Sequence, residues 1–237
     1  MRLDKLLSNM GYGSRKEIKL IVKSKAVEVN GKVAKDVSMH VDSEKDDILI
    51  SGEKVIYTEF IYLMMNKPPG VISATEDKKD QTVIDLLDPI DQHFQPFPVG
   101  RLDKDTEGLL LITNDGHLTH QLLSPKKHVP KLYFAEIDGM VTEEDILRFK
   151  EGVILEDGYL TKPGDLTILR SGETSEIELI ITEGKFHQVK RMFEAVGKRV
   201  TYLKRLKMGS LELDSTLELG QYRPLTEKEL EELKPKE

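Results

Sequence analysis

The chain has 237 residues, of which 38% are hydrophobic and 32% are charged. This is the composition of a globular protein, and the length suggests two modules. The absence of cysteine from the sequence excludes disulfides, thiolate nucleophiles, iron–sulfur clusters and cysteine-ligated zinc. No apolar run approaches the roughly 20 residues that span a bilayer, and no apolar signal core follows the start. We therefore expect a cytoplasmic protein without a membrane partner.

The net charge of −7 is distributed unevenly along the chain. Residues 1–35 contain nine basic and three acidic side chains, and residues 185–207 contain eight basic side chains and one acidic side chain. The acidic surplus lies elsewhere, notably in residues 143–157 and in the C-terminal tail. A local excess of Lys and Arg attracts phosphates whatever the overall charge. The two basic patches therefore predict a polyanion that docks at two places, although either patch alone could be an ordinary solvated surface.

The N-terminal residues carry the signals of a small module with two helices and a hairpin. Apolar residues at helical spacing predict a short helix over residues 3–10. Ser14 and Glu17 have the spacing of a capping box at the start of a second helix, whose outer face is basic. Asn-Gly at 30–31 predicts a hairpin turn, and residues 47–50 predict a further strand.

After a linker at residues 55–59, short apolar runs alternate with turns and helical stretches. Strands are predicted for residues 61–65, 109–113, 131–137, 177–181, 211–213 and near 222. Helices are predicted for residues 82–87, 117–123, 142–150, within the basic segment 184–197 and over 227–237, and a hairpin for 153–161. The fold class is α+β, with a small N-terminal α/β module (1–58) and a larger domain (59–237), in which helices flank a mixed, mostly antiparallel sheet.

The first unusual segment is the charged loop at residues 100–108, which leads directly into an apolar strand. A carboxylate at this point lies at the edge of a low-dielectric core, where an unpaired charge is unfavourable and pKa values shift. Asp103 and Asp105 are the candidates. The alternative is a turn in which Arg101 pairs with one of these carboxylates.

The second unusual segment is the basic stretch 183–193. Phe186, Val189 and Phe193 are expected to face the core on one helical stripe. The remaining surface then presents donors suited to phosphates or to a buried carboxylate, namely His187, Gln188, Lys190 and Arg191. Glu194 is the only acid of the expected helix, so a solvent-exposed face of internal salt bridges explains the pattern poorly.

Cofactor motifs are missing from the sequence. The six histidines show no metal-ligand spacing, and neither a phosphate-binding glycine loop nor a nucleophile elbow occurs. We therefore expect neither a metal nor a nucleotide or other cofactor.

The ordered motifs resemble two known families. The first 55 or so residues resemble the RNA-binding module named for ribosomal protein S-four, through Arg-Leu-Asp-Lys-Leu-Leu at 2–7, Ser-Arg-Lys at 14–16 and Val-Glu-Val-Asn-Gly at 27–31. From Tyr62 onward the chain resembles the RsuA-type pseudouridine synthases, which modify ribosomal RNA. The motifs that carry this resemblance are Asn-Lys-Pro-Pro-Gly at 66–70, Gly-Arg-Leu-Asp at 100–103, Lys-Leu-Tyr at 131–133 and His-Gln-Val-Lys-Arg-Met at 187–192. Together the motifs span nearly the whole chain.

The resemblance implies an isomerase that breaks the N-glycosidic bond of a uridine, turns the base and rejoins it through carbon. Asp103 would be the nucleophile, and attack on the sugar, attack on the base and an elimination route all remain open. Lys190 would keep Asp103 ionised, with Arg191 as the alternative, and sister families use arginine at this point. Tyr133 resembles the family tyrosine that stacks on the target base.

The resemblance also implies an RNA partner whose target uridine is flipped out of the stack. The expected RNA-binding residues are Arg2, Arg15, Lys16, Lys19, Lys67, Arg101, His187, Gln188 and Arg191. We expect the partner to be ribosomal RNA or a small-subunit assembly intermediate. The compact size and the basic loop at 124–128 favour 16S ribosomal RNA, and we expect a monomer. The alternatives are a 23S ribosomal RNA synthase and a non-catalytic factor that binds ribosomal RNA or assists ribosome assembly.

Overall fold

The structure, a computed structural model, describes residues 1–233. The chain forms two compact units. The first comprises Met1–Ile61 with Asp88–Gln95, and the second comprises Tyr62–Leu87 with the chain from Pro96 onward. Within the described residues, no helix is long and apolar enough to cross a membrane.

The first unit contains the two helices and the small sheet that the sequence predicts. The two predicted helices are α1 (Leu3–Asn9) and α2 (Arg15–Lys23), and the unit also contains the short helix α3 (Pro89–Gln92), which was not predicted. The antiparallel strands lie in the order β2 (Lys32–Val33), β1 (Val27–Val29), β3 (Ile48–Ile50) and β4 (Glu53–Lys54). The capping box is confirmed, because Ser14 Oγ accepts from Glu17 N and the Glu17 carboxylate accepts from Ser14 N. Leu3, Leu7 and Ile18 are fully buried and form the core between the helices and the sheet.

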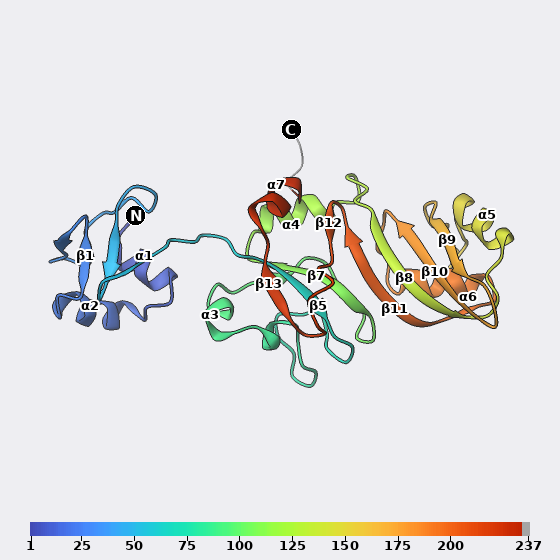
Figure 1. Cartoon of the computed structure of the whole chain (residues 1–237), viewed down its shortest axis with the longest axis horizontal. Coiled ribbons are helices and arrows are strands. Elements are labelled where there is room, and N and C mark those ends of the chain that lie inside the picture. The colour runs from blue at the N-terminus through green and yellow to red at the C-terminus, as the bar shows by residue number, and fades with distance from the viewer. Residues whose placement is uncertain (234–237) are drawn as a thin grey trace. The chain divides into compact units, whose positions relative to one another are not determined.

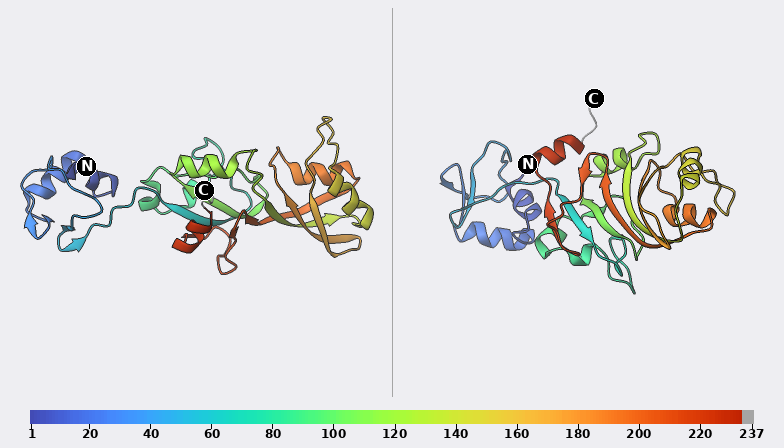
Figure 2. Two further views of the ribbon diagram at one scale, coloured as in Figure 1. Left: turned by 90° about the horizontal axis from the view of Figure 1, so that it is seen from above. Right: turned by 45° about the vertical axis from the view of Figure 1, so that its right-hand side comes forward.

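The second unit is built on one large sheet (Figure 1). Within residues 1–233 its strands are β5 (Tyr62–Lys67), β6 (Phe97–Pro98), β7 (Glu107–Thr113), β8 (Lys131–Asp138), β9 (Asp165–Arg170), β10 (Thr174–Ile181), β11 (Arg199–Met208), β12 (Leu211–Glu212) and β13 (Tyr222–Pro224). The main order is β13-β5-β7-β11-β8-β10-β9. The pair β7–β11 is parallel, whereas the other pairs between the described strands of this sheet are antiparallel. The mixed, mostly antiparallel sheet is therefore confirmed, and Figure 2 shows its twist.

Helices flank this sheet, as predicted. They are the 3₁₀ turn η1 (Ile84–Leu86), α4 (Gly116–Leu123), α5 (Glu143–Glu151), α6 (Gln188–Ala195) and α7 (Glu227–Leu233). Helix α5 packs on β9 and α6 packs on β11. Residues 234–237 of the predicted C-terminal helix lie outside the described residues.

Three further local features test the sequence predictions. The short helix predicted for residues 82–87 is confirmed only as the 3₁₀ turn η1, because Asp85 accepts from the Thr82 backbone and Pro89 follows closely. The predicted hairpin at 153–161 is confirmed, because Ile154 and Leu160 form an antiparallel bridge and Thr161 N donates to Val153 O at 3.0 Å. Strands β9 and β11 were not predicted, and in β11 four basic residues obscure the apolar pattern.

Candidate active site

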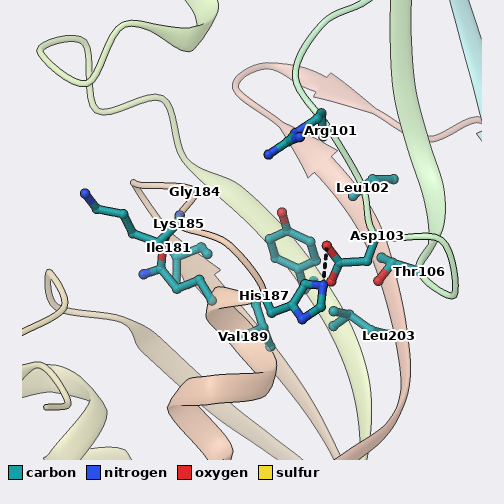
Figure 3. A pocket seen from close by; sticks show the side chains of 12 residues that line it. Arg101, Leu102, Asp103, Thr106, Ile181, Gly184, Lys185, His187, Val189 and Leu203 are labelled. Atoms are coloured by element: carbon teal, nitrogen blue, oxygen red, sulfur yellow. Dashed lines mark hydrogen bonds and ion pairs between the residues drawn. The ribbon is translucent and has the colours of Figure 1, made fainter. Parts of the chain in front are cut away.

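A pocket in the second unit brings together the two unusual segments of the sequence (Figure 3). It has a volume of about 420 Å³ including its open mouth. The loop 101–106 and the segment 184–189 contribute residues to its lining. Strands β8, β10 and β11 contribute Tyr133, Ile181 and Leu203. The pocket therefore combines charged loop residues with an apolar surface supplied by the sheet.

Asp103 lines this pocket, and its carboxylate meets two basic side chains. Lys190 Nζ lies 3.3 Å from Asp103 Oδ2, and His187 Nε2 lies 3.6 Å from Asp103 Oδ1. The side chains of Asp103 and Lys190 are 25% and 19% exposed. Because water reaches the pair only in part, it screens their attraction less than it screens a surface ion pair.

Lys190 is shared with a second carboxylate. Its Nζ donates to Asp105 Oδ1 at 2.6 Å, although the Asp105 side chain is 73% exposed. Partial burial would raise the pKa of Asp105, but the hydrogen bond and the charge of Lys190 outweigh it and lower that pKa. The alternative in which Arg101 pairs with one of the two aspartates is wrong, because Lys190 is the cation bound to both, and Arg101 is an exposed residue of the pocket lining.

Two residues that the loop motif does not contain hold the Asp103 loop in place. Ser73 Oγ donates to Leu102 O and accepts from Leu102 N, both at 3.0 Å. Lys67 Nζ donates to the carbonyls of Pro68, Lys104 and Thr106 at 3.0, 3.4 and 2.9 Å. The loop therefore has hydrogen-bonded supports on both sides of Asp103.

Lys67 was expected to bind RNA, and this prediction is wrong. Its side chain is fully buried at the end of β5, and its ammonium is enclosed by backbone carbonyls. Burial lowers the pKa of Lys67 to about 8, although Asp105, Asp103 and Glu107 favour its charged form. An ammonium in this position supports the loop and cannot reach a phosphate.

Gly108 allows β7 and β11 to approach each other beside the loop. It has a φ of +101°, and a Cβ there would lie 2.2 Å from the carbonyl oxygen of Arg205. Arg205 is itself buried, and its Nε donates to Leu109 O at 2.8 Å. Sequence reasoning missed the structural role of Arg205, because the strand that contains it was not recognised and an arginine is not expected to be buried.

Tyr133 lies on β8, directly opposite Arg205 of β11, and it lines the pocket. Only 7% of the residue is exposed. Strand β8 lies between β11 and β10, so the backbone of Tyr133 is held on both sides by neighbouring strands. The loop that carries Asp103 borders the same pocket. An aromatic ring and a carboxylate in one open pocket can bind a planar base beside a nucleophile.

The other predicted residues of the basic segment differ in accessibility. His187 lines the pocket and is partly exposed. Gln188 is buried, and its amide donates to Glu183 at 2.6 Å and accepts from Lys185 N at 2.8 Å, so the prediction of a phosphate contact is wrong for it. Arg191 pairs with Asp157 at 2.5 Å and with Glu156 at 3.8 Å, which directs its guanidinium to these acids. Its side chain is 15% exposed, so RNA contact would require these ion pairs to open.

The predicted RNA-binding residues of the first unit lie on its surface. Arg15, Lys16 and Lys19 are exposed on α2. The guanidinium of Arg2 pairs with the buried carboxylate of Asp4 at 2.7 Å and is half exposed. Within residues 1–233, no cluster of three or more histidine or carboxylate side chains is placed to hold a metal ion.

Two family models match the chain, over two separate ranges of residues. A model described as RNA pseudouridylate synthase matches residues 61–195, and a model described as S4 domain matches residues 1–48. The chain belongs to the RNA pseudouridylate synthase family and carries an N-terminal S4 domain. The resemblance stated from the motifs is thereby confirmed.

Full-length relatives support the assignment. The chain is 60% identical over 232 residues to an uncharacterized RNA pseudouridine synthase of Bacillus subtilis, with 97% of each chain covered. It is 39% identical to the ribosomal large subunit pseudouridine synthase B of Bacillus subtilis (98% of this chain and 95% of the relative) and 38% identical to the ribosomal small subunit pseudouridine synthase A of Haemophilus influenzae (98% and 99%). A crystal structure of a pseudouridylate synthase matches with a TM-score of 0.69 and 36% identity, covering 98% of this chain and 99% of the other.

Proposed function

We propose that this chain isomerises a specific uridine of ribosomal RNA to pseudouridine, with Asp103 as the nucleophile. The observation that carries the proposal is the ion pair between Asp103 and Lys190, with 3.3 Å between Oδ2 and Nζ, in a pocket that Tyr133 also lines. An ionised carboxylate with little hydration is a competent nucleophile for covalent catalysis.

The reaction exchanges one bond between the base and the sugar for another. The bond between C1′ and N1 breaks, the base turns, and a bond forms between C1′ and C5, while C5 loses a proton and N1 gains one. Asp103 would form the covalent link, to either the sugar or the base. Lys190 would keep the carboxylate ionised before it attacks and after it is released, and the partly enclosed site makes their attraction effective.

Tyr133 would hold the base. Its ring is fixed on β8, and stacking of a base on an aromatic ring contributes about 1–3 kcal/mol. A flipped uridine needs such contacts because leaving the helical stack costs a few kcal/mol. We propose that Arg101 holds the RNA backbone at the mouth of the pocket, where it is exposed.

We propose that the S4 domain, residues 1–58, supplies a second RNA contact through Arg15, Lys16 and Lys19, and that residues 59–237 form the catalytic domain. The exposed basic face of α2 supports the first assignment. The names of the relatives point to ribosomal RNA, but they include enzymes of both subunits at nearly equal identity. Our preference for 16S ribosomal RNA thus stays a prediction.

The test is to map pseudouridines in both ribosomal RNAs from a strain that lacks this protein. The expected result is the loss of one pseudouridine, restored by the wild-type gene and not by Asp103→Asn. Loss from 23S instead of 16S ribosomal RNA would contradict the subunit preference alone. An unchanged map in both RNAs would contradict the proposed activity on ribosomal RNA and favour a non-catalytic binding factor.

A further inference from the structure

Phe186 was expected to face the core, and the structure corrects this. It lies in the turn before α6, and 68% of the residue is exposed. Val189 and Phe193, which lie on α6 itself, are buried as expected. The exposed phenyl ring is therefore not needed to pack the helix against the sheet.

The ring is ordered by its neighbour in the sequence. The rings of Phe186 and His187 stack with 3.7 Å between their centroids and 19° between their planes. His187 has a φ of +48°, a left-handed conformation that is uncommon for residues other than glycine. This conformation at the N-cap interrupts the helical phase and brings the two consecutive rings together.

The turn that carries this aromatic pair is braced from inside. The buried Gln188 accepts from Lys185 N at 2.8 Å through its side chain, and its own backbone N–H donates to Lys185 O at 3.1 Å. Phe186 O accepts from Arg191 Nη1 at 3.4 Å. Phe186 and His187 thus project from a fixed turn.

The aromatic pair adjoins the proposed reaction centre. His187 lines the pocket and contacts Asp103, so the inner face of the Phe186 ring covers a pocket residue while its outer face is open. The pocket beside this pair is lined by two exposed cationic residues, Lys185 and Arg101, and Lys185 Nζ lies 4.5 Å from the centroid of the Tyr159 ring. An open aromatic face beside a pocket with cationic lining suits a base attached to phosphates better than an apolar protein surface.

We propose that the outer face of Phe186 is a stacking platform for the nucleobase next to the target uridine. The base that remains in the strand would stack on Phe186, while the uridine turns past His187 towards Asp103 and Tyr133. The platform would compensate for the stacking that the neighbour loses when the uridine leaves. This inference rests on the proposed function.

The first test is kinetic and uses whichever ribosomal RNA or subunit particle the wild-type enzyme modifies. Phe186→Ala should raise KM about tenfold, within the range expected for the loss of one stacked base, with kcat changed by less than about threefold. Phe186→Trp should keep KM within about threefold of wild type, because it preserves an aromatic face. Leu147→Ala is the matched control, since Leu147 is 62% exposed on α5 and does not line the pocket.

The second test needs no turnover. Because the sequence contains no tryptophan, Phe186→Trp introduces a single fluorescent reporter. Addition of the same RNA should quench its fluorescence by stacking, and the fluorescence of the control Leu147→Trp should not change. A wild-type KM for Phe186→Ala, or unchanged fluorescence of Phe186→Trp at RNA concentrations that saturate the enzyme, would overturn the platform while leaving the proposed function intact. Absence of turnover by the wild type on every RNA and particle would instead refute the proposed function.

Discussion

Lys67 provides the sharpest test of how the pocket is built. We consider Lys67→Met, which keeps most of the side-chain volume and removes the ammonium that binds three backbone carbonyls. Burial lowers the pKa of Lys67 to about 8 from its ordinary 10.5. The folded protein therefore releases this proton near pH 8, and the unfolded chain holds it until about pH 10.5. In between, the unfolded state binds more protons, so stability rises with pH.

The size of this effect follows from the two pKa values. Each pKa unit corresponds to 1.36 kcal/mol, so the lysine should stabilise the wild type by about 2.5 kcal/mol more at pH 10 than at pH 7. Below pH 8 the full desolvation penalty of the charged amine is present. Lys67→Met lacks this titration. Between pH 7 and pH 10, the unfolding free energy of the wild type should therefore rise by about 2.5 kcal/mol relative to that of the variant.

The assay is urea unfolding of both proteins at several pH values from 7 to 10, because the titration of all other groups cancels in the difference. Lys150→Met, which removes an exposed lysine on α5, is the matched control. A difference between wild type and Lys67→Met that stays constant within about 0.5 kcal/mol over this range would refute the burial of the ammonium.

Two further predictions concern the strands and the ion pair. Gly108→Ala should destabilise the protein by about 3 kcal/mol or more, because its Cβ would meet Arg205 O at 2.2 Å. The control Gly158→Ala should cost about 1 kcal/mol, because Gly158 has a φ of +81° but open space around it. Equal losses of unfolding free energy in urea would contradict the close approach of β7 and β11. Lys190→Met should lower kcat about 10²–10³-fold, because Asp103 loses the ammonium at 3.3 Å, and Lys190→Arg should restore most of it. A kcat for Lys190→Met within threefold of wild type would remove Lys190 from the mechanism.

Local signals in the sequence sufficed for the elements that depend on neighbouring residues. The Ser14–Glu17 capping box, the Asn-Gly turn at 30–31 and the apolar run of β7 were recognisable because each involves contacts within a few residues. Strand β11 was missed because its pairing with β7 and β8 joins distant parts of the chain, while its own basic residues indicate a surface.

For the site, too, the sequence indicated the local motifs and not the contacts between distant residues. The motifs drew attention to Asp103 and to the basic segment, and the resemblance favoured Lys190 over Arg191 as the cation beside the carboxylate, which is where the structure places it. The burial of Lys67 was beyond sequence reasoning, because the carbonyl of Thr106 that binds it is 39 positions away. Phe186 was misplaced because a continuous helical phase was assumed through His187, where the backbone turns left-handed.

The central claim is that Asp103 performs the covalent step. Replacement of the hydrogen at C5 by C1′ releases that hydrogen, so turnover can be followed as tritium release from ribosomal RNA labelled at C5 of uridine. Asp103→Asn preserves the shape of the side chain and removes its charge. We predict that its tritium release falls by at least about 10³-fold while its Kd for the RNA stays within about threefold of wild type. Tritium release by Asp103→Asn within tenfold of the wild-type rate would contradict the account.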